Sequence, residues 1–137
     1  MNEYDHIKKI IKIWEDCSLS DIDEIIKLRR DLSVYYYRLA EIKAIDERGF
    51  LTWETQRKSN FYHAKMEAIE SGKSAAASEV IAETRKDVVE ARKEEVTFER
   101  DYKKAKDILS SLDHVLNSMS SAINQATNER KQSNYHT

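Results

Sequence analysis

Apolar side chains recur at intervals of three and four residues along most of the chain, which is the spacing of an amphipathic α-helix. The first stripe predicts a short helix and consists of Tyr4, Ile7, Ile10, Ile11 and Trp14. Residues 16–20 interrupt the pattern. Ser18 or Ser20 is then expected to cap the next helix by accepting a hydrogen bond from a free backbone N–H group.

A second helical pattern begins at Ile22 and continues to about Ile69 without a proline. Its apolar residues keep near-helical spacing: Ile25, Leu28, Leu32, Tyr35, Leu39, Ile42, Trp53 and Phe61. Gly49 lies inside this pattern, where glycine costs about 1 kcal/mol relative to alanine. We interpret it either as a bend or as the close approach of a neighbouring helix.

Residues 71–74 form the one strong break after residue 20, because Gly72 suits the left-handed end of one helix and Ser74 can cap the next. A third helix is predicted from about Ser74 to Arg130, with a heptad repeat. One seam position holds Ile81, Val88, Glu95, Tyr102, Leu109, Leu116 and Ile123, and the other holds Ala77, Thr84, Ala91, Phe98, Ala105, Leu112, Met119 and Ala126.

The predicted fold is all-α: a short N-terminal helix followed by a long antiparallel helical hairpin that resembles a coiled coil. The absence of proline and the presence of only two glycines support it, because β-turns and hairpins depend on these residues. We expect an amphipathic helix and linker in residues 1–20, one hairpin domain in 21–130 and a frayed tail in 131–137. Since each helix of a hairpin buries only one stripe, copies are expected to assemble into a homo-oligomeric bundle or ring.

Residues 108–128 carry a single formal charge, Asp113, whereas acids and bases alternate in residues 79–107. A helix with so little charge can pack on several sides, so this segment is predicted to join copies of the chain. The residues expected to make that contact are Leu109, Leu112, Leu116, Met119 and Ile123. The alternating charges are interpreted as a solvated face, and Glu95 is expected to turn to solvent rather than pair across the hairpin.

The sequence offers little for catalysis or membrane insertion. Its apolar runs are far shorter than the roughly 20 residues that a membrane-spanning helix needs. None of the four histidines pairs with another histidine or with Cys17 at metal-ligand spacing, and no phosphate loop or nucleophile elbow is present. We therefore expect a protein without enzyme activity, metal or cofactor. The lone cysteine and the absence of a signal peptide favour the cytoplasm.

The net charge of −2 exerts no global attraction on nucleic acid, but residues 27–73 carry 10 basic and 7 acidic side chains. In KLRRDLSVYYYRL and in WETQRKSNFYHAK the basic residues are interleaved with aromatic ones. Single-stranded nucleic acid is commonly held in this way, with cations along its backbone and aromatic faces stacked on its bases. Because consecutive helical residues point about 100° apart, at least one of Tyr35, Tyr36 and Tyr37 must face the seam.

The segment WETQRKSNFYHAKMEAIESGK resembles the UvsY family of phage recombination mediators, through ETQRK and through HAKMEAIESG before the predicted turn. Members of that family load a RecA-class recombinase onto single-stranded DNA that is coated by single-strand-binding protein. The resemblance implies a multimeric accessory protein with these partners. In the family, the stretch corresponding to HAKMEA contacts DNA, which implies that role for His63 and Lys65, with Arg57 and Lys58 as neighbours. His63 stands where the family has a firm cation.

Seven residues are thus candidates for contact with single-stranded DNA: Tyr36, Arg38, Arg57, Lys58, Tyr62, His63 and Lys65. Two other interpretations stay open. In the first, the chain is a coiled-coil scaffold, an assembly chaperone or a small inhibitor that binds no nucleic acid. In the second, the N-terminal helix docks into a groove of a partner protein, and its removal leaves the hairpin folded.

Overall fold

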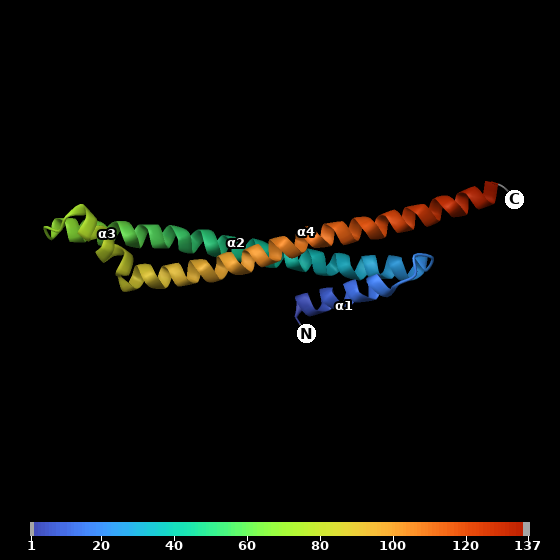
Figure 1. The fold of residues 1–137 in the computed structure, drawn as a ribbon, viewed down its shortest axis with the longest axis horizontal. Coiled ribbons are helices and arrows are strands. Elements are labelled where there is room, and N and C mark those ends of the chain that lie inside the picture. The colour runs from blue at the N-terminus through green and yellow to red at the C-terminus, as the bar shows by residue number, and fades with distance from the viewer. Residues whose placement is uncertain (1, 136–137) are drawn as a thin grey trace. The chain divides into compact units, whose positions relative to one another are not determined.

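The computed structural model describes residues 2–135. Within them the chain forms four α-helices and no strand: α1, Glu3–Asp16; α2, Ile22–Glu70; α3, Ala75–Thr84; and α4, Lys86–Tyr135 (Figure 1). The prediction of an all-α fold is confirmed. The described residues divide into two compact units, with 2–41 and 105–135 in unit 1 and 42–104 in unit 2. α2 and α4 contribute residues to both units.

The start of α2 is capped by an aspartate. The Oδ1 atom of Asp21 accepts a hydrogen bond from the backbone N–H of Glu24 at 3.3 Å. The hydroxyl of Ser18 instead accepts from the backbone N–H of Ser20 at 3.3 Å, within the linker. The predicted serine cap is therefore wrong, because the two serines bond to each other in the turn before the helix begins.

The predicted third helix is two helices. Gly72, with φ +93°, and Ser74, whose hydroxyl caps α3, separate α3 from α2 as expected. α3 then ends at Thr84, and Arg85 has extended backbone with φ −64° and ψ 138°. The Thr84 hydroxyl donates to the carbonyls of Val80 and Ile81 in the preceding turn. The Arg85 side chain forms ion pairs with Glu67 and Asp87 at the break.

The break changes which residues are buried. Ser78 and Ala82 are the buried residues of α3, whereas Ile81 and Thr84 of the predicted seam are exposed. The predicted seam fails there because a heptad register cannot continue through an extended residue. At the other end, α4 reaches Tyr135, so residues 131–135 of the predicted tail are helical. Residues 136 and 137 lie outside the described part of the chain.

Unit 1 holds the large apolar side chains of the core. Its three helices share one buried cluster: Ile7 and Ile10 from α1; Ile22, Ile25, Leu28, Leu32 and Leu39 from α2; and Ala105, Leu109, Leu112 and Met119 from α4. The apolar face of α1 is therefore already occupied within the chain. This finding disagrees with the interpretation that α1 is a free docking helix.

The residues that were predicted to join copies of the chain belong to the same core. Leu109, Leu112 and Met119 are at most 8% exposed, and Leu116 and Ile123 pack against the cluster while partly buried. The low charge of residues 108–128 is explained by this packing, because α1 and α2 cover the helix within one chain. Leu109, Leu112 and Met119 are thus buried by contacts within one chain, whereas Leu116 and Ile123 stay partly exposed, and the assignment of these five residues to assembly stays a prediction.

Unit 2 has a much thinner interior. Its buried apolar residues are four alanines and one valine: Ala64, Ala68, Ala82, Val88 and Ala91. Around them, later residues of α2 contact earlier residues of α4. Phe50 stacks on Tyr102 with ring centroids 6.3 Å apart, and farther along α2 the Asn60 side-chain amide donates to the backbone carbonyl of Asp87. Small side chains allow the two helices to approach closely in this unit.

Gly49 marks a close approach of α4. A Cβ atom at this position would lie only 2.6 Å from Cε1 of Phe98, so the phenyl ring packs directly on the glycine backbone. Of the two interpretations made from the sequence, the neighbouring helix is the one that the structure supports.

Asp46 of α2 is expected to make stability depend on pH. Burial raises its pKa above the ordinary value of 3.8, and the negative charge of Asp101 on α4 raises the pKa further. Stability contributed by the protonated form is lost as pH rises through the folded-state pKa. Asp46→Asn should therefore have a larger free energy of unfolding than the wild type at pH 7, and the gain should shrink towards about pH 4. Urea unfolding at both pH values measures this, and a less stable variant at pH 7 would disprove it.

Candidate nucleic-acid interface

The seven candidate residues fall in both units. Tyr36 and Arg38 belong to unit 1, and Arg57, Lys58, Tyr62, His63 and Lys65 belong to unit 2.

The three consecutive tyrosines of unit 1 have different environments. Tyr35 stacks on His6 of α1, with ring centroids 5.1 Å apart, and the guanidinium of Arg38 lies 5.3 Å from the Tyr35 ring. Tyr36 packs against the core and donates a hydrogen bond to Asp113, which raises the pKa of the Tyr36 phenol. Tyr37 is 73% exposed. The outward tyrosine is thus Tyr37 and not the candidate Tyr36.

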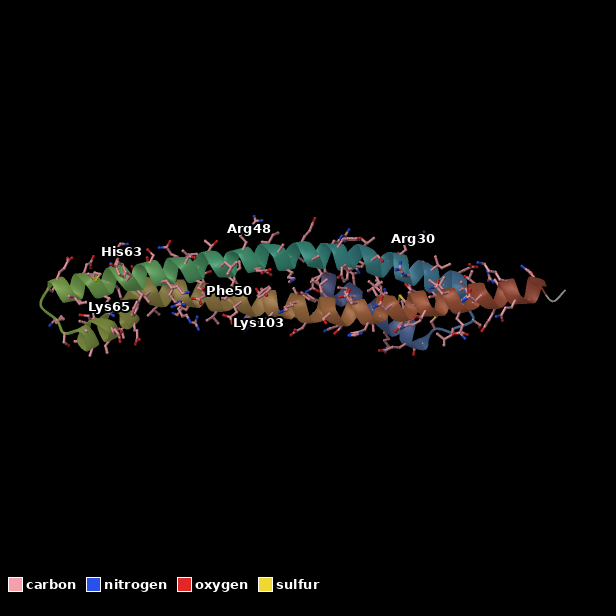
Figure 2. All side chains as sticks on the ribbon, turned by 90° about the horizontal axis from the view of Figure 1, so that it is seen from above. Arg30, Arg48, Phe50, His63, Lys65 and Lys103 are labelled. Atoms are coloured by element: carbon pink, nitrogen blue, oxygen red, sulfur yellow. The ribbon has the colours of Figure 1, made fainter. Side chains whose placement is uncertain are left out.

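A groove of about 630 Å³ lies beside Tyr37 on unit 1. We call it the arginine groove, and its lining residues are Ile26, Arg29, Arg30, Ser33, Val34 and Tyr37 of α2 with Ser120, Ile123 and Asn124 of α4. The α2 residues recur at intervals of three and four, which places them on one helix face. Arg29 donates from Nε to the hydroxyl of Ser120 at 2.8 Å, and Arg30 is exposed on α2 (Figure 2).

The arginine groove combines positive charge with neutral hydrogen-bonding groups. None of its nine lining residues is a carboxylate. A guanidinium has five N–H donors, so the single printed bond of Arg29 leaves donors for a ligand. Chemically, the groove suits an anionic ligand that also presents a flat apolar face to the ring of Tyr37.

Three cationic candidates of unit 2 are already engaged by carboxylates. Lys58 lies 2.9 Å from Glu54 of the same helix, and Lys65 lies 3.2 Å from Glu79 of α3. Arg57 is bound by Glu95 of α4. Each pair reduces the charge that the cation offers to a nucleic acid.

Glu95 is buried and paired, so the expectation that it turns to solvent is wrong. Its side chain is 3% exposed and accepts hydrogen bonds from Arg57 on α2 and from Arg92 on α4, the latter at 2.6 Å. The alanine-rich interior of unit 2 leaves room for a long polar side chain between the helices. The opposite charge on α2 then determines where the carboxylate points.

Tyr62 and His63 are the exposed aromatic members of the unit 2 group, in which Lys58 is exposed as well. Tyr62 is 60% exposed, and its ring meets that of His63 edge-on at 5.9 Å. His63 lies on the side of α2 that faces away from α4 (Figure 2). The two residues offer ring faces at the surface, with the cations nearest in sequence already paired.

A regular line of cations on α4 was missed at the sequence level. Lys86, Lys93 and Arg100 are spaced by seven residues and therefore share one exposed face of α4. The acidic residues Asp87, Glu94 and Asp101 follow each of them by one position, on the neighbouring face. The seven-residue period of these charges is the signal that identifies both faces.

Residues 2–135 contain neither a cluster of metal ligands nor a helix that could span a membrane. No group of three or more histidine, cysteine or carboxylate side chains is placed to hold a metal ion in this part of the chain. No helix in the same range has the length and apolar character needed to cross a membrane.

No family model, no curated protein and no solved structure matches the chain.

Proposed function

We propose that the chain is a non-enzymatic protein that binds single-stranded DNA in the arginine groove of unit 1. The observation that carries this proposal is the combination of two exposed arginines and a 73% exposed tyrosine in a groove without a carboxylate. Arg29 and Arg30 bind phosphates, and Tyr37 stacks on an unpaired base. A base stack of this kind contributes about 1–3 kcal/mol.

The same groove disfavours a duplex. Tyr37 needs the face of a base, and in a duplex the base faces are covered by neighbouring pairs. Ser33, Ser120 and Asn124 add neutral donors and acceptors that fit phosphate oxygens or base edges. Preference for single strands therefore comes from stacking, and affinity comes mainly from phosphate contacts.

The broader role that we propose is recombination mediation in the cytoplasm. A long antiparallel hairpin that assembles as a homo-oligomer multiplies a weak contact without any new type of contact. The mediator would promote loading of a RecA-class recombinase in place of single-strand-binding protein. The resemblance of ETQRK and HAKMEAIESG to the UvsY family supports this role.

A scaffold, chaperone or inhibitor without nucleic-acid binding is the second candidate. The ion pairs of Arg57, Lys58 and Lys65 favour this candidate. Because each of these cations contacts a carboxylate of the same chain, its presence is accounted for without a nucleic acid. Binding of single-stranded DNA separates the two candidates.

The test is fluorescence anisotropy of a labelled single strand and of the matching duplex, at low and at physiological salt. We expect a salt-sensitive preference for the single strand. Arg29→Ala/Arg30→Ala should weaken it at least about tenfold, or about 1.4 kcal/mol. The matched control is Lys58→Ala/Lys65→Ala, which removes two cations from unit 2 and should change affinity less than about threefold.

Two results would oppose the proposal. Absence of single-strand binding by the folded wild type at low salt would favour the scaffold interpretation. A greater loss in the lysine variant than in the arginine variant would move the site to unit 2. With binding established, addition of recombinase and single-strand-binding protein tests the mediator role.

A further inference from the structure

The outer face of α2 in unit 2 carries a second stripe at coiled-coil spacing. Its members recur at intervals of three and four and are exposed or half-exposed: Ala44, Arg48, Leu51, Thr55, Ser59, Tyr62 and Met66. We call this set the outer stripe. Leu51 is 52% and Tyr62 is 60% exposed, and Arg48 is the only charged member. Arg48 projects from α2 on the side away from α4 (Figure 2).

The outer stripe contrasts with the interior of unit 2. Four of the five buried apolar residues of unit 2 are alanines, while larger apolar side chains lie outside. A lone solvated helix face is normally rich in charge, whereas this one holds one charge in seven positions. The composition is that of a helix face which packs on another helix.

The spacing of the outer stripe is compatible with a second copy as its occupant. The intervals between its members are 4, 3, 4, 4, 3 and 4 residues, so the spacing is the same in both directions from Thr55, although the residue types differ. A two-fold axis places identical patches against each other, with every contact occurring twice. Two antiparallel copies centred on Thr55 therefore bring Arg48 opposite Tyr62, Leu51 opposite Ser59 and Ala44 opposite Met66.

Charge complementarity favours this antiparallel pairing. The only charge of the stripe then meets an aromatic ring, a favourable arrangement for a guanidinium. Beside the stripe, Glu47 meets His63, which offers a carboxylate to an imidazole. A parallel pair would instead oppose Arg48 to Arg48 at the same level.

We propose that the outer stripe of α2 binds the same stripe of a second copy of this chain, antiparallel, with Thr55 on the two-fold axis. The contact uses no residue of the arginine groove. It is distinct from the contact predicted through Leu109, Leu112, Leu116, Met119 and Ile123.

Disulfide trapping tests the register directly. Cys17 is the single cysteine of the chain and is first changed to serine. In that background, Thr55→Cys should form a covalent dimer on mild oxidation. Ser59→Cys alone should not, because its two copies are eight residues apart along the helix, about 12 Å, and a disulfide needs Cα atoms within about 7 Å. Mixing the Leu51→Cys and Ser59→Cys chains should restore cross-linking.

Sedimentation velocity provides the second readout, without DNA. Leu51→Glu should shift the dimer to monomer, with unchanged helicity, because Leu51 is exposed in the single chain. The matched control is Val80→Glu, at an apolar position of α3 that is 61% exposed compared with 52% for Leu51, and this variant should remain dimeric. The proposal is overturned if the wild type is monomeric at about 100 μM, or if Ser59→Cys cross-links as well as Thr55→Cys. A monomeric wild type would remove the avidity of an oligomer, but the contacts that the arginine groove makes within one chain are tested separately by the Arg29→Ala/Arg30→Ala variant.

Discussion

Replacing Ile7 with alanine is expected to lower the free energy of unfolding by about 2–5 kcal/mol, the usual cost of removing a large buried aliphatic side chain. Ile7 is 2% exposed and lies in the cluster that α1 forms with α2 and α4. This loss of stability has two parts. The removed methyl and methylene groups no longer contribute the free energy of transfer out of water, and a cavity remains where they were. Urea unfolding followed by far-ultraviolet circular dichroism measures the effect.

Ile13→Ala is the matched control for this prediction. Ile13 has the same side chain on the same helix but is 40% exposed, so its truncation should cost less than about 1 kcal/mol. Equal and small effects at both positions would mean that α1 does not belong to the core. In that case its apolar face would again be available for a partner protein.

Glu95→Ala is expected to destabilise the chain by about 2–4 kcal/mol, since breaking a buried ion pair leaves the other charge without a partner. Arg57 would keep its guanidinium beside the alanine interior of unit 2 with no carboxylate to accept from it. The lower part of the range reflects the 27% exposure of the Arg57 side chain, through which water reaches the charge. Chemical unfolding of the purified variant measures this change in the free energy of unfolding.

Two variants distinguish the ion pair from a simple packing defect. Arg92→Ala removes the more exposed partner of Glu95 and should cost less than about 1 kcal/mol. Arg57→Leu/Glu95→Leu replaces both charges by apolar groups and should recover most or all of the stability lost in Glu95→Ala. An unchanged stability of Glu95→Ala would show that the carboxylate contributes nothing to unit 2.

The helical segments were predictable because the chain lacks proline and keeps its apolar spacing over long stretches. α1 and α2 begin and end within two residues of the predicted positions. The break at Arg85 was not predictable in the same way, because no proline or glycine marks it. There Arg85 forms ion pairs with Glu67 of α2 and Asp87 of α4, and a heptad pattern does not detect such contacts.

The residues of the candidate site were predicted less well than the fold. The basic aromatic block includes the arginine groove, but Tyr36 was selected where Tyr37 is exposed. The buried positions Leu32 and Leu39 fix the inward direction of α2, and Tyr37 lies about 150° from it at 100° per residue. Phasing the helix on these leucines would have selected Tyr37 together with Arg30, seven residues earlier.

A single sequence does not show which charged residues on different helices form ion pairs. Glu95 was expected in solvent because its partner Arg57 lies 38 positions away in the chain. The five residues assigned to assembly were correctly identified as apolar and poorly solvated. These residues pack, however, against the rest of unit 1. Periodicity identifies a buried helix face but does not identify the element that covers it.

The salt dependence of single-strand binding tests the central proposal most directly. For single strands, the logarithm of the binding constant falls with the logarithm of salt concentration by about 0.7 for each phosphate contact. Arg29→Ala/Arg30→Ala should therefore lower the slope by about 1.4 relative to the wild type, and Lys58→Ala/Lys65→Ala should leave it unchanged. An unaltered slope in the arginine variant would contradict the assignment of phosphate contacts to the arginine groove.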